Sequence, residues 1–398
     1  MKKRFSITAV IMLMLIASAL TWFALIIIVG YPFAANSNKS GEVRDFAALL
    51  TKIEELYIGD YDQEYIAAEA MRATVYALGD PWSFYMTPAE YASYLDSSGN
   101  RYEGLGINIV TDEETGAMVI VSVFRDSSAE AAGIAAGDMI IAVDGTEIYG
   151  MTIPDVKEIL TRPLGETARL TLIRADGSVE SVDVVYDVIH IDPVSYEMLD
   201  GNIGYIILSN FNEGAAQRFI YAANKLVDQG ASGFVFDFRG NPGGFVTEVT
   251  AILDFLLPEG EIFVAVDRNG HETVTKSDEA FLDTSAVVMV DRYSFSGAEY
   301  VTALLAEYGY APVVGEQTTG KSRMQMHVEL PGGGAINISF AEYLTKNRVS
   351  LHDAGGLTPH HEVVLSEEEM SLLYSGSLAI EDDPQLQKAL ELLHVNPY

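Results

Sequence analysis

The sequence contains no cysteine among its 398 residues. This absence excludes disulfide bonds, zinc sites built on thiolates and a cysteine nucleophile. It does not fix the cellular compartment, because many secreted bacterial-type proteins lack disulfides. Low-complexity tracts and internal repeats are also absent, and 49% hydrophobic with 20% charged residues is a globular composition.

Basic residues are scarce as well. There are 24 Lys and Arg residues against 57 Asp and Glu residues, which gives a net charge of −33. This balance argues against nucleic acid or an anionic membrane surface as the main partner. The acidic residues are spread along the chain, as on a solvated surface. A chain of this length is expected to form two or more folded units.

Histidine is the third scarce residue, and no pair of histidines has the helical spacing of a zinc site. Because no histidine–carboxylate arrangement stands out either, the sequence disfavours a metal hydrolase, and we expect neither a metal nor a cofactor. The seven histidines are His190, His271, His327, His352, His360, His361 and His394.

The N-terminus carries a long apolar run. Lys2, Lys3 and Arg4 precede residues 7–29, and the next charge is Lys39. The run is long enough to span a bilayer. The basic residues before it predict that the N-terminus stays on the cytoplasmic side of the membrane. We therefore predict a signal anchor at residues 1–35 in the cell membrane, with everything after about residue 36 exported. The alternative is a secreted protein, cleaved near Ala35.

The exported part changes its pattern along the chain. Residues 36–97 have helical apolar spacing, with a short third helix near 88–95. Residues 98–187 read as a small mixed domain of short strands and helices. In residues 188–366 strands alternate with longer helices, which predicts an α/β fold with a mostly parallel sheet. A hairpin over 324–340 and a C-terminal helical segment at 367–398 complete the chain.

The segment from Asp291 to Glu299 joins a strand predicted at 287–290 to a helix predicted at 298–308. A serine on such a turn, Ser296, lies beside free N–H groups at the positive end of a helix. Those donors can stabilise an oxyanion, and Gly297 permits close approach of a substrate. On this segment alone the capping-box interpretation, with Ser296 as N-cap and Glu299 at N3, is favoured.

A glycine-rich loop follows the strand predicted at 234–238. Gly240, Gly243 and Gly244 precede the next helix, so their amides could bind an anion or complete an oxyanion hole. Neither the phosphate-loop ending nor the dinucleotide spacing is present. A tight strand-to-helix turn is an equally good interpretation, and Asp237 with Arg239 could form a structural ion pair.

Lys321 and Gln325 stand four residues apart at the start of the hairpin. A lysine can act as general base for a serine if burial lowers its pKa, and the Gln325 amide could orient it. A surface lysine beside a turn is the competing interpretation. His327 shares the polar face of the strand with Gln325 and is the alternative base.

Together these segments resemble the carboxyl-terminal processing peptidases, or tail-specific proteases, which are Ser/Lys enzymes. The resemblance covers most of the chain beyond about residue 43. It implies a crotonase/ClpP-like α/β core with an inserted PDZ domain. It assigns Ser296 as nucleophile, Lys321 as base and Gln325 as third member, with Gly297, Gly243 and Gly244 forming the oxyanion hole. The motifs are Ser294-x-Ser296-x-x-Glu299, Gly320-Lys321-x-x-x-Gln325, Asp237 to Gly244, Gly79 to Pro88 and Asp383-x-Gln385-Leu386-x-x-Ala389.

The mixed domain resembles a protease-type PDZ domain through Gly133 to Asp138 and the stretch ending at Gly145. Its carboxylate-binding loop corresponds to Gly104, Leu105, Gly106 and Ile107. Such a loop holds the terminal carboxylate of a peptide that adds as a strand to the sheet edge. Arg162, in the turn after the domain's second helix, is our candidate for a contact that gates the active site.

The sequence departs from the family pattern at four positions. Tyr293 and Phe295 replace small residues beside the nucleophile, Asp291 replaces Asn, and Ser322 replaces Gly. These changes leave the Ser/Lys/Gln set intact. We therefore predict a serine endopeptidase that captures apolar, uncharged protein C-termini. The alternatives are an inactive membrane-anchored PDZ adaptor and a crotonase-like acyl-transfer enzyme. The oligomeric state stays open, with a homo-oligomer among the alternatives.

Overall fold

The computed structural model describes residues 40–112 and 115–395, so the predicted anchor at 1–35 lies outside the described residues. Within the described ranges, no helix is both long enough and apolar enough to cross a membrane. The chain divides into two compact units, one ending at Ala67 and the other beginning at Ala68.

The first unit contains α2 (Ser40–Leu56) and the start of α3 (Gln63–Tyr76). Asp62 precedes α3 and its carboxylate accepts hydrogen bonds from the amides of Glu64 (2.9 Å) and Tyr65 (3.0 Å). A side-chain oxygen in this position satisfies amides that have no partner inside the helix. The two long helices predicted from apolar spacing are confirmed.

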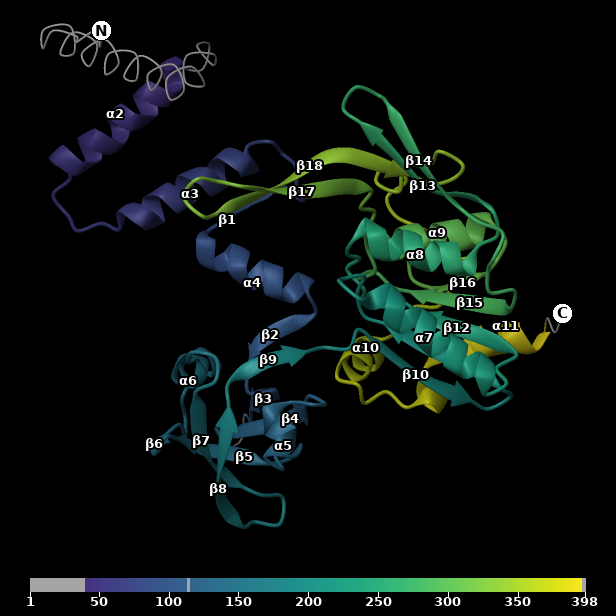
Figure 1. Ribbon diagram of the computed structural model, residues 1–398, viewed down its shortest axis with the longest axis horizontal. Helices are drawn as coiled ribbons and strands as arrows, with labels where there is room; N and C mark the ends of the chain where they lie inside the picture. Colours follow the sequence, from purple (N-terminus) through teal and green to yellow (C-terminus); the bar gives the residue numbers. More distant parts are fainter. Residues whose placement is uncertain (1–39, 113–114, 396–398) are drawn as a thin grey trace, which may run out of the picture. The chain divides into compact units, whose positions relative to one another are not determined.

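The second unit is built on a six-stranded sheet in the order β10-β11-β12-β15-β16-β19 (Figure 1). The β10–β11 pair is antiparallel and the other pairs are parallel, so the predicted mostly parallel sheet is confirmed. The strands are β10 (Val194–Leu199), β11 (Ile203–Leu208), β12 (Gly233–Asp237), β15 (Ser285–Val290), β16 (Val313–Gly315) and β19 (His361–Glu362).

Helices cover both faces of this sheet. Phe234 and Phe236 of β12 pack in the cluster that includes α7 (Ala215–Asp228), α8 (Val246–Leu256) and α9 (Gly297–Glu307). Val235, between them, packs in the cluster that includes α11 (Pro384–Val395). Because successive strand residues point to opposite faces, a strand covered on both sides must be apolar throughout. The continuous apolar run of β12 follows from this arrangement.

A second sheet has the order β1-β18-β13-β14, and β17 pairs with β18. The predicted hairpin is present as β17 (Arg323–Glu329) and β18 (Ala335–Leu344). Not every strand of residues 188–366 joins the parallel sheet, because β13 (Gly260–Asp267) pairs antiparallel with β14 (Glu272–Ser277) and β18. An apolar run does not specify which sheet a strand joins.

The mixed domain has the sheet order β3-β4-β5-β7-β8, with β6 paired to β5. Its core contains Met118, Ile140, Val156 and Leu170, each fully or almost fully buried. β3 is an edge strand, so its outer hydrogen-bonding groups are open to a further strand. The elements are β3 (Ile107–Thr111), β4 (Met118–Val123), α5 (Ser128–Ala131), β5 (Met139–Val143), β6 (Thr146–Glu147), α6 (Ile153–Leu160), β7 (Thr167–Ile173) and β8 (Val179–Val185).

Shorter elements connect these parts. β2 (Arg101–Gly104) pairs with β9 (Asp187–His190) at the two ends of the mixed domain. The helix predicted near 88–95 is α4 (Pro88–Ser98), and it follows β1 (Phe84–Met86). α10 (Glu367–Tyr374) and a 3-10 turn, η1 (Ile380–Asp382), precede α11.

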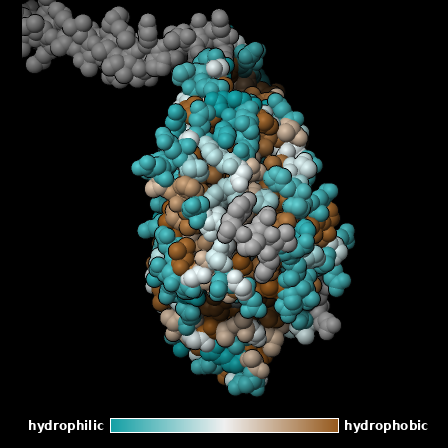
Figure 2. Space-filling view, turned by 90° about the vertical axis from the view of Figure 1, so that its right-hand side faces the viewer, coloured by the Kyte–Doolittle hydropathy of each residue, from teal (hydrophilic) through white to brown (hydrophobic). Residues whose placement is uncertain are grey.

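The surface agrees with the composition. In Figure 2, hydrophilic residues cover much of the visible face and hydrophobic residues lie in patches between them. Such a mixture is usual for a soluble domain, because polar atoms alone cannot cover a folded chain.

Candidate active site

Ser296 occupies the turn between β15 and α9, as predicted. Its backbone has φ 59° and ψ −119°, a conformation that a residue with a Cβ atom rarely adopts. The turn is held in place by Ser294, whose hydroxyl donates to the carbonyl oxygen of Phe238 at 2.8 Å. Strained backbone of this kind persists where the surroundings enforce it, and it is frequent at functional sites.

The glycine-rich loop lies directly against this turn. A Cβ atom on Gly243 would be 2.6 Å from the amide nitrogen of Gly297 and 2.8 Å from the Cβ of Ser296. Phe295 donates its amide hydrogen to the carbonyl oxygen of Asn241 at 3.0 Å. Since β12 and β15 are neighbouring parallel strands, the loops after them meet at one edge of the sheet. Only glycine fits at this contact.

The amides of the three predicted oxyanion glycines differ in their partners. Gly243 donates its N–H to the side-chain oxygen of Asn241 at 2.8 Å. The N–H groups of Gly244 and Gly297 have no acceptor among the described residues. An ideal Cβ on Gly297 would lie 3.6 Å from the nitrogen of Gly244. The two open donors beside Ser296 are therefore Gly244 and Gly297, and Gly243 serves the loop itself.

Glu299 connects the serine segment to the lysine segment. Its buried carboxylate accepts hydrogen bonds from the amides of Ser296 (2.9 Å) and Lys321 (2.8 Å). The amide of Gly320 (2.6 Å) and the hydroxyl of Thr318 donate to the same side chain. The sequence indicated only the bond to Ser296, which belongs to the capping box. The bonds to residues about 20 positions later had no local signal.

Lys321 is half-buried, and its amine lies over two aromatic rings. Its Nζ lies 4.8 Å from the ring centre of Trp82 and 5.8 Å from that of Phe295. These two rings are stacked, with centres 5.8 Å apart. Burial lowers the pKa of Lys321 to about 8, and the carboxylates of Asp80 and Glu299 oppose this shift. Its ammonium can therefore lose a proton near neutral pH.

The three members of the predicted catalytic set are not hydrogen-bonded to one another. Within the described residues, the Nζ of Lys321 bonds neither to the Oγ of Ser296 nor to Gln325. The Gln325 amide instead donates to the carbonyl oxygen of Arg323 (2.8 Å) and to Ser339 (3.0 Å). The orientation of Lys321 by Gln325, expected from the family pattern, is absent from this conformation.

Tyr343 of β18 is a further residue at the site that carried no sequence signal. Its hydroxyl oxygen lies 3.4 Å from the Oγ of Ser296 and donates to the carbonyl oxygen of Lys321. Burial raises the pKa of Tyr343, so its hydroxyl stays protonated. The side chain thus links the serine to the backbone of the lysine.

The departures from the family pattern have distinct environments. Asp291 accepts hydrogen bonds from the amides of Gly240 (3.0 Å) and Tyr293 (2.9 Å), so it fixes the glycine-rich loop. Ser322 is buried and donates to Glu342 at 3.2 Å. Phe295 covers the amine of Lys321, whereas Tyr293 is half exposed and touches the ring of Tyr374.

Two other predicted features are structural. Arg239 forms buried ion pairs with Asp237 (2.6 Å) and Asp383 (2.8 Å), and it donates to Gln385. The C-terminal motif thus anchors the glycine-rich loop through Arg239. Although desolvation opposes it, this pair of carboxylates holds the pKa of Arg239 well above its usual range.

His327, the alternative base, lies on β17 against aromatic rings of α4. Its ring centre is 4.7 Å from that of Tyr94 and 6.4 Å from that of Tyr91. Desolvation lowers its pKa, and its buried Nδ1 has no hydrogen-bond partner in the described part of the chain. These contacts place His327 in the packing of α4 on the hairpin rather than beside Ser296.

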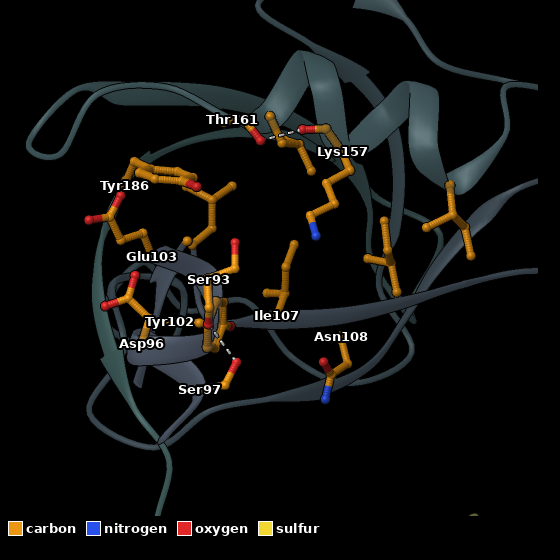
Figure 3. Close-up of a pocket in the computed structure, with 15 residues that line it drawn as sticks. Ser93, Asp96, Ser97, Tyr102, Glu103, Ile107, Asn108, Lys157, Thr161 and Tyr186 are labelled. Carbon is orange, nitrogen blue, oxygen red and sulfur yellow. Dashed lines mark hydrogen bonds between the residues drawn. The ribbon is translucent and has the colours of Figure 1, made fainter. Parts of the chain in front are cut away.

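The predicted peptide-binding loop lines a cavity of about 590 Å³ in the mixed domain. Gly104, Leu105 and Ile107 contribute to its wall, together with residues of α6 and of α4 (Figure 3). The adjacent Gly106 has φ 90°, and a Cβ there would lie 2.2 Å from that of Ser127. The loop therefore needs glycine, and the cavity runs beside the open edge of β3.

The guanidinium of Arg162 bonds to residues of the mixed domain itself. It pairs with Asp144 at 3.0 Å and donates to the carbonyl oxygens of Leu160 (3.2 Å) and Thr167 (2.8 Å). Among the described residues it has no partner outside this domain, so its gating role stays a prediction.

Comparisons with known proteins agree with this architecture. A family model described as peptidase family S41 matches residues 202–363, and a PDZ domain model matches residues 119–174. The carboxyl-terminal-processing protease of a Picosynechococcus species is 32% identical over 333 residues, covering 82% of this chain and 79% of the relative. The carboxy-terminal processing protease CtpA of Bacillus subtilis is 30% identical over 312 residues, covering 77% of this chain and 66% of the relative.

Among solved structures, a putative S41 protease from Bacteroides fragilis has the same fold, with a TM-score of 0.56. The similarity covers 81% of this chain and 90% of that one at 19% identity. This likeness shows a shared fold.

Proposed function

The chain belongs to peptidase family S41, as a carboxyl-terminal processing protease, and we propose that Ser296 and Lys321 carry its chemistry. The observation that supports this assignment is a convergence at one sheet edge. There Ser296, on a strained turn, lies beside the open amides of Gly244 and Gly297. The carboxylate of Glu299 accepts hydrogen bonds from the backbones of Ser296 and Lys321, and the pKa of Lys321 is lowered. Neither metal nor cofactor has a role in this scheme.

In the proposed reaction, neutral Lys321 removes the proton of the Ser296 hydroxyl as its Oγ attacks a peptide carbonyl carbon. The amides of Gly244 and Gly297 stabilise the negative oxygen of the tetrahedral intermediate. Lys321 then delivers the proton to the departing amine. Water releases the acyl group from Ser296 by the same steps in reverse.

The chemistry requires a movement of the lysine. Its amine lies over Trp82 and Phe295, so the side chain must turn toward Ser296 before the proton transfer. Phe295 covers the amine where the family has a small residue. We propose that this aromatic contact holds Lys321 away from the serine until a substrate is bound.

We further propose that the PDZ domain captures the C-terminus of the substrate. The open edge of β3 can accept an added strand, and the loop at Gly104 to Ile107 can hold the terminal carboxylate. Residues 1–35 would anchor the enzyme in the membrane with its peptidase core outside the cytoplasm. This last proposal relies on the apolar run and its basic flank.

A tail-exchange experiment tests the proposed function. A loosely folded reporter protein with an apolar last residue is incubated with the enzyme, and fragments are identified by mass spectrometry. We expect cleavage near the C-terminus that disappears with Ser296→Ala. Cleavage should fall roughly tenfold or more when the last residue is charged, because an apolar pocket binds a charge poorly. Equal cleavage of both reporters would contradict tail capture, and cleavage by Ser296→Ala would contradict the nucleophile.

The pH dependence tests the base. A general base must be neutral, and the neutral fraction of Lys321 grows as pH rises through its pKa of about 8. We therefore expect kcat/KM to increase about tenfold per pH unit below pH 7 and to level off above pH 9. Asp80→Asn removes a carboxylate that favours the charged amine, so this profile should move to lower pH. A flat profile between pH 6 and 9 would exclude Lys321 as the base.

A further inference from the structure

The cavity beside the loop at residues 104–107 is lined by one lysine, Lys157, that forms no ion pair with any described residue. Residues 101–190 include six Lys and Arg residues, of which four form ion pairs with carboxylates: Arg101, Arg162, Arg169 and Arg174. Among the described residues, Lys157 and Arg125 form none. Only Lys157 lines the cavity. Lys157 is solvent-exposed, so its ammonium is accessible to an anionic group of a bound peptide.

The side chain of Lys157 points into the cavity. Figure 3 shows it extending from α6 toward Ile107 of β3, with Thr161 on the side of Glu103 and Tyr186. Its amine makes no hydrogen bond or ion pair with any described residue. A peptide that added to the edge of β3 would run between β3 and α6, and therefore close to this amine.

The spacing of the groove sets which peptide residue meets Lys157. Side chains of an added strand that face α6 are two residues apart, or roughly 6.6 Å along the peptide. One turn of helix advances about 5.4 Å, so successive inward side chains meet successive turns of α6. With the terminal carboxylate at the loop, the last side chain meets Leu105 and Leu160. The side chain two residues earlier then meets Lys157.

The remaining charges of the cavity oppose an acidic residue at the very end of the tail. Asp96 and Glu103 line the cavity beside the loop, and Asp96 pairs with Arg101 at 3.2 Å. Because Arg101 compensates Asp96, Glu103 supplies the unbalanced negative charge there, and this charge disfavours a carboxylate side chain on the last residue. Lys157 is the only Lys or Arg side chain that lines this cavity, so a carboxylate is favoured only beside it.

We propose that Lys157 selects protein tails with Asp or Glu two residues before an apolar C-terminal residue. This inference rests on the proposed capture of C-termini in the PDZ groove. It changes the expected substrate from an uncharged tail to one with a single acidic side chain at a defined position. The contact is solvent-exposed, so the acidic side chain should add a selectivity of about threefold to fivefold.

The test measures peptide binding to the full chain carrying Ser296→Ala, which prevents cleavage. Fluorescence anisotropy compares tails with Glu, Ala or Lys at the third position from the end, and one Glu tail with an amidated terminus. We expect the Glu tail to bind about threefold to fivefold more tightly than the Ala tail, with the difference fading at 0.5 M salt. Lys157→Met should abolish the difference, and Lys157→Glu should reverse it in favour of the Lys tail. Arg125→Met, the matched control outside the cavity, should leave it unchanged.

The outcomes separate this inference from the proposed function. If the Glu and Ala tails bound equally to the Ser296→Ala chain that keeps Lys157, the proposed selectivity would be overturned and tail capture would stand. If Lys157→Met lowered the affinity for the Glu and Ala tails equally, Lys157 would bind the terminal carboxylate instead. This result would also overturn the proposed selectivity. If amidation has no effect, or no tail binds, tail capture itself fails and the selectivity fails with it.

Discussion

Lys321→Met is expected to reduce kcat/KM roughly 10²-fold to 10⁴-fold without unfolding the enzyme. A positioned general base contributes a factor of this size, and methionine retains most of the side-chain volume but cannot accept a proton. The melting temperature should not fall, because the buried ammonium is desolvated in the folded state and methionine removes that cost. Peptidase assays with the tailed reporter and a thermal melt measure both effects.

His327→Ala is the matched control for the base. His327 contacts Tyr91 and Tyr94, and its loss should change the melting temperature more than the activity. Activity within a few-fold of the original enzyme is expected. If Lys321→Met retained activity and His327→Ala lost it, the base would be the histidine and the assignment of Lys321 would be wrong.

Glu299→Gln is the second change with a large expected effect. The carboxylate accepts three backbone N–H groups and one hydroxyl, whereas an amide has one accepting oxygen and turns an NH₂ group toward the other donors. With two donors left unsatisfied in a buried site, the free energy of unfolding should fall by about 2–4 kcal/mol. The backbones of Ser296 and Lys321 would lose their common anchor, so kcat/KM should fall roughly 10²-fold.

Glu307→Gln on the same helix provides the comparison for Glu299. Glu307 accepts a single hydrogen bond, from the amide of Asn347 at 3.1 Å, and lies away from Ser296 and Lys321 on α9. We expect it to change activity less than twofold. A Glu299→Gln enzyme that lost about 1 kcal/mol of stability but kept its activity would reduce Glu299 to an ordinary helix cap.

The parts of the fold that the sequence predicted correctly are those specified by local patterns. The helix α9 and the strands β12 and β15 follow from apolar spacing and lie within a residue or two of the predicted ranges. The turn that carries Ser296 was predictable because a buried strand is followed by a short connection and then a helix. The glycine-rich loop was predictable at the same edge, because parallel strands with helical connections end together. β13 joins the second sheet because it pairs with β14 and with β18, which lies about 80 residues away along the chain, and an apolar run specifies neither partner.

The catalytic residue types were determined by the sequence alone, through the spacing of its motifs, while the tertiary structure decided their relations. Glu299 joins Ser296 to Lys321, and Tyr343 bridges the same pair, through contacts between residues 20 to 50 positions apart. Packing also decided that Gly244 rather than Gly243 has an open amide, and that Trp82 and Phe295 cover the lysine. The physical reason is that desolvation and hydrogen-bond partners depend on neighbours in space, and spacing along the chain does not specify those neighbours.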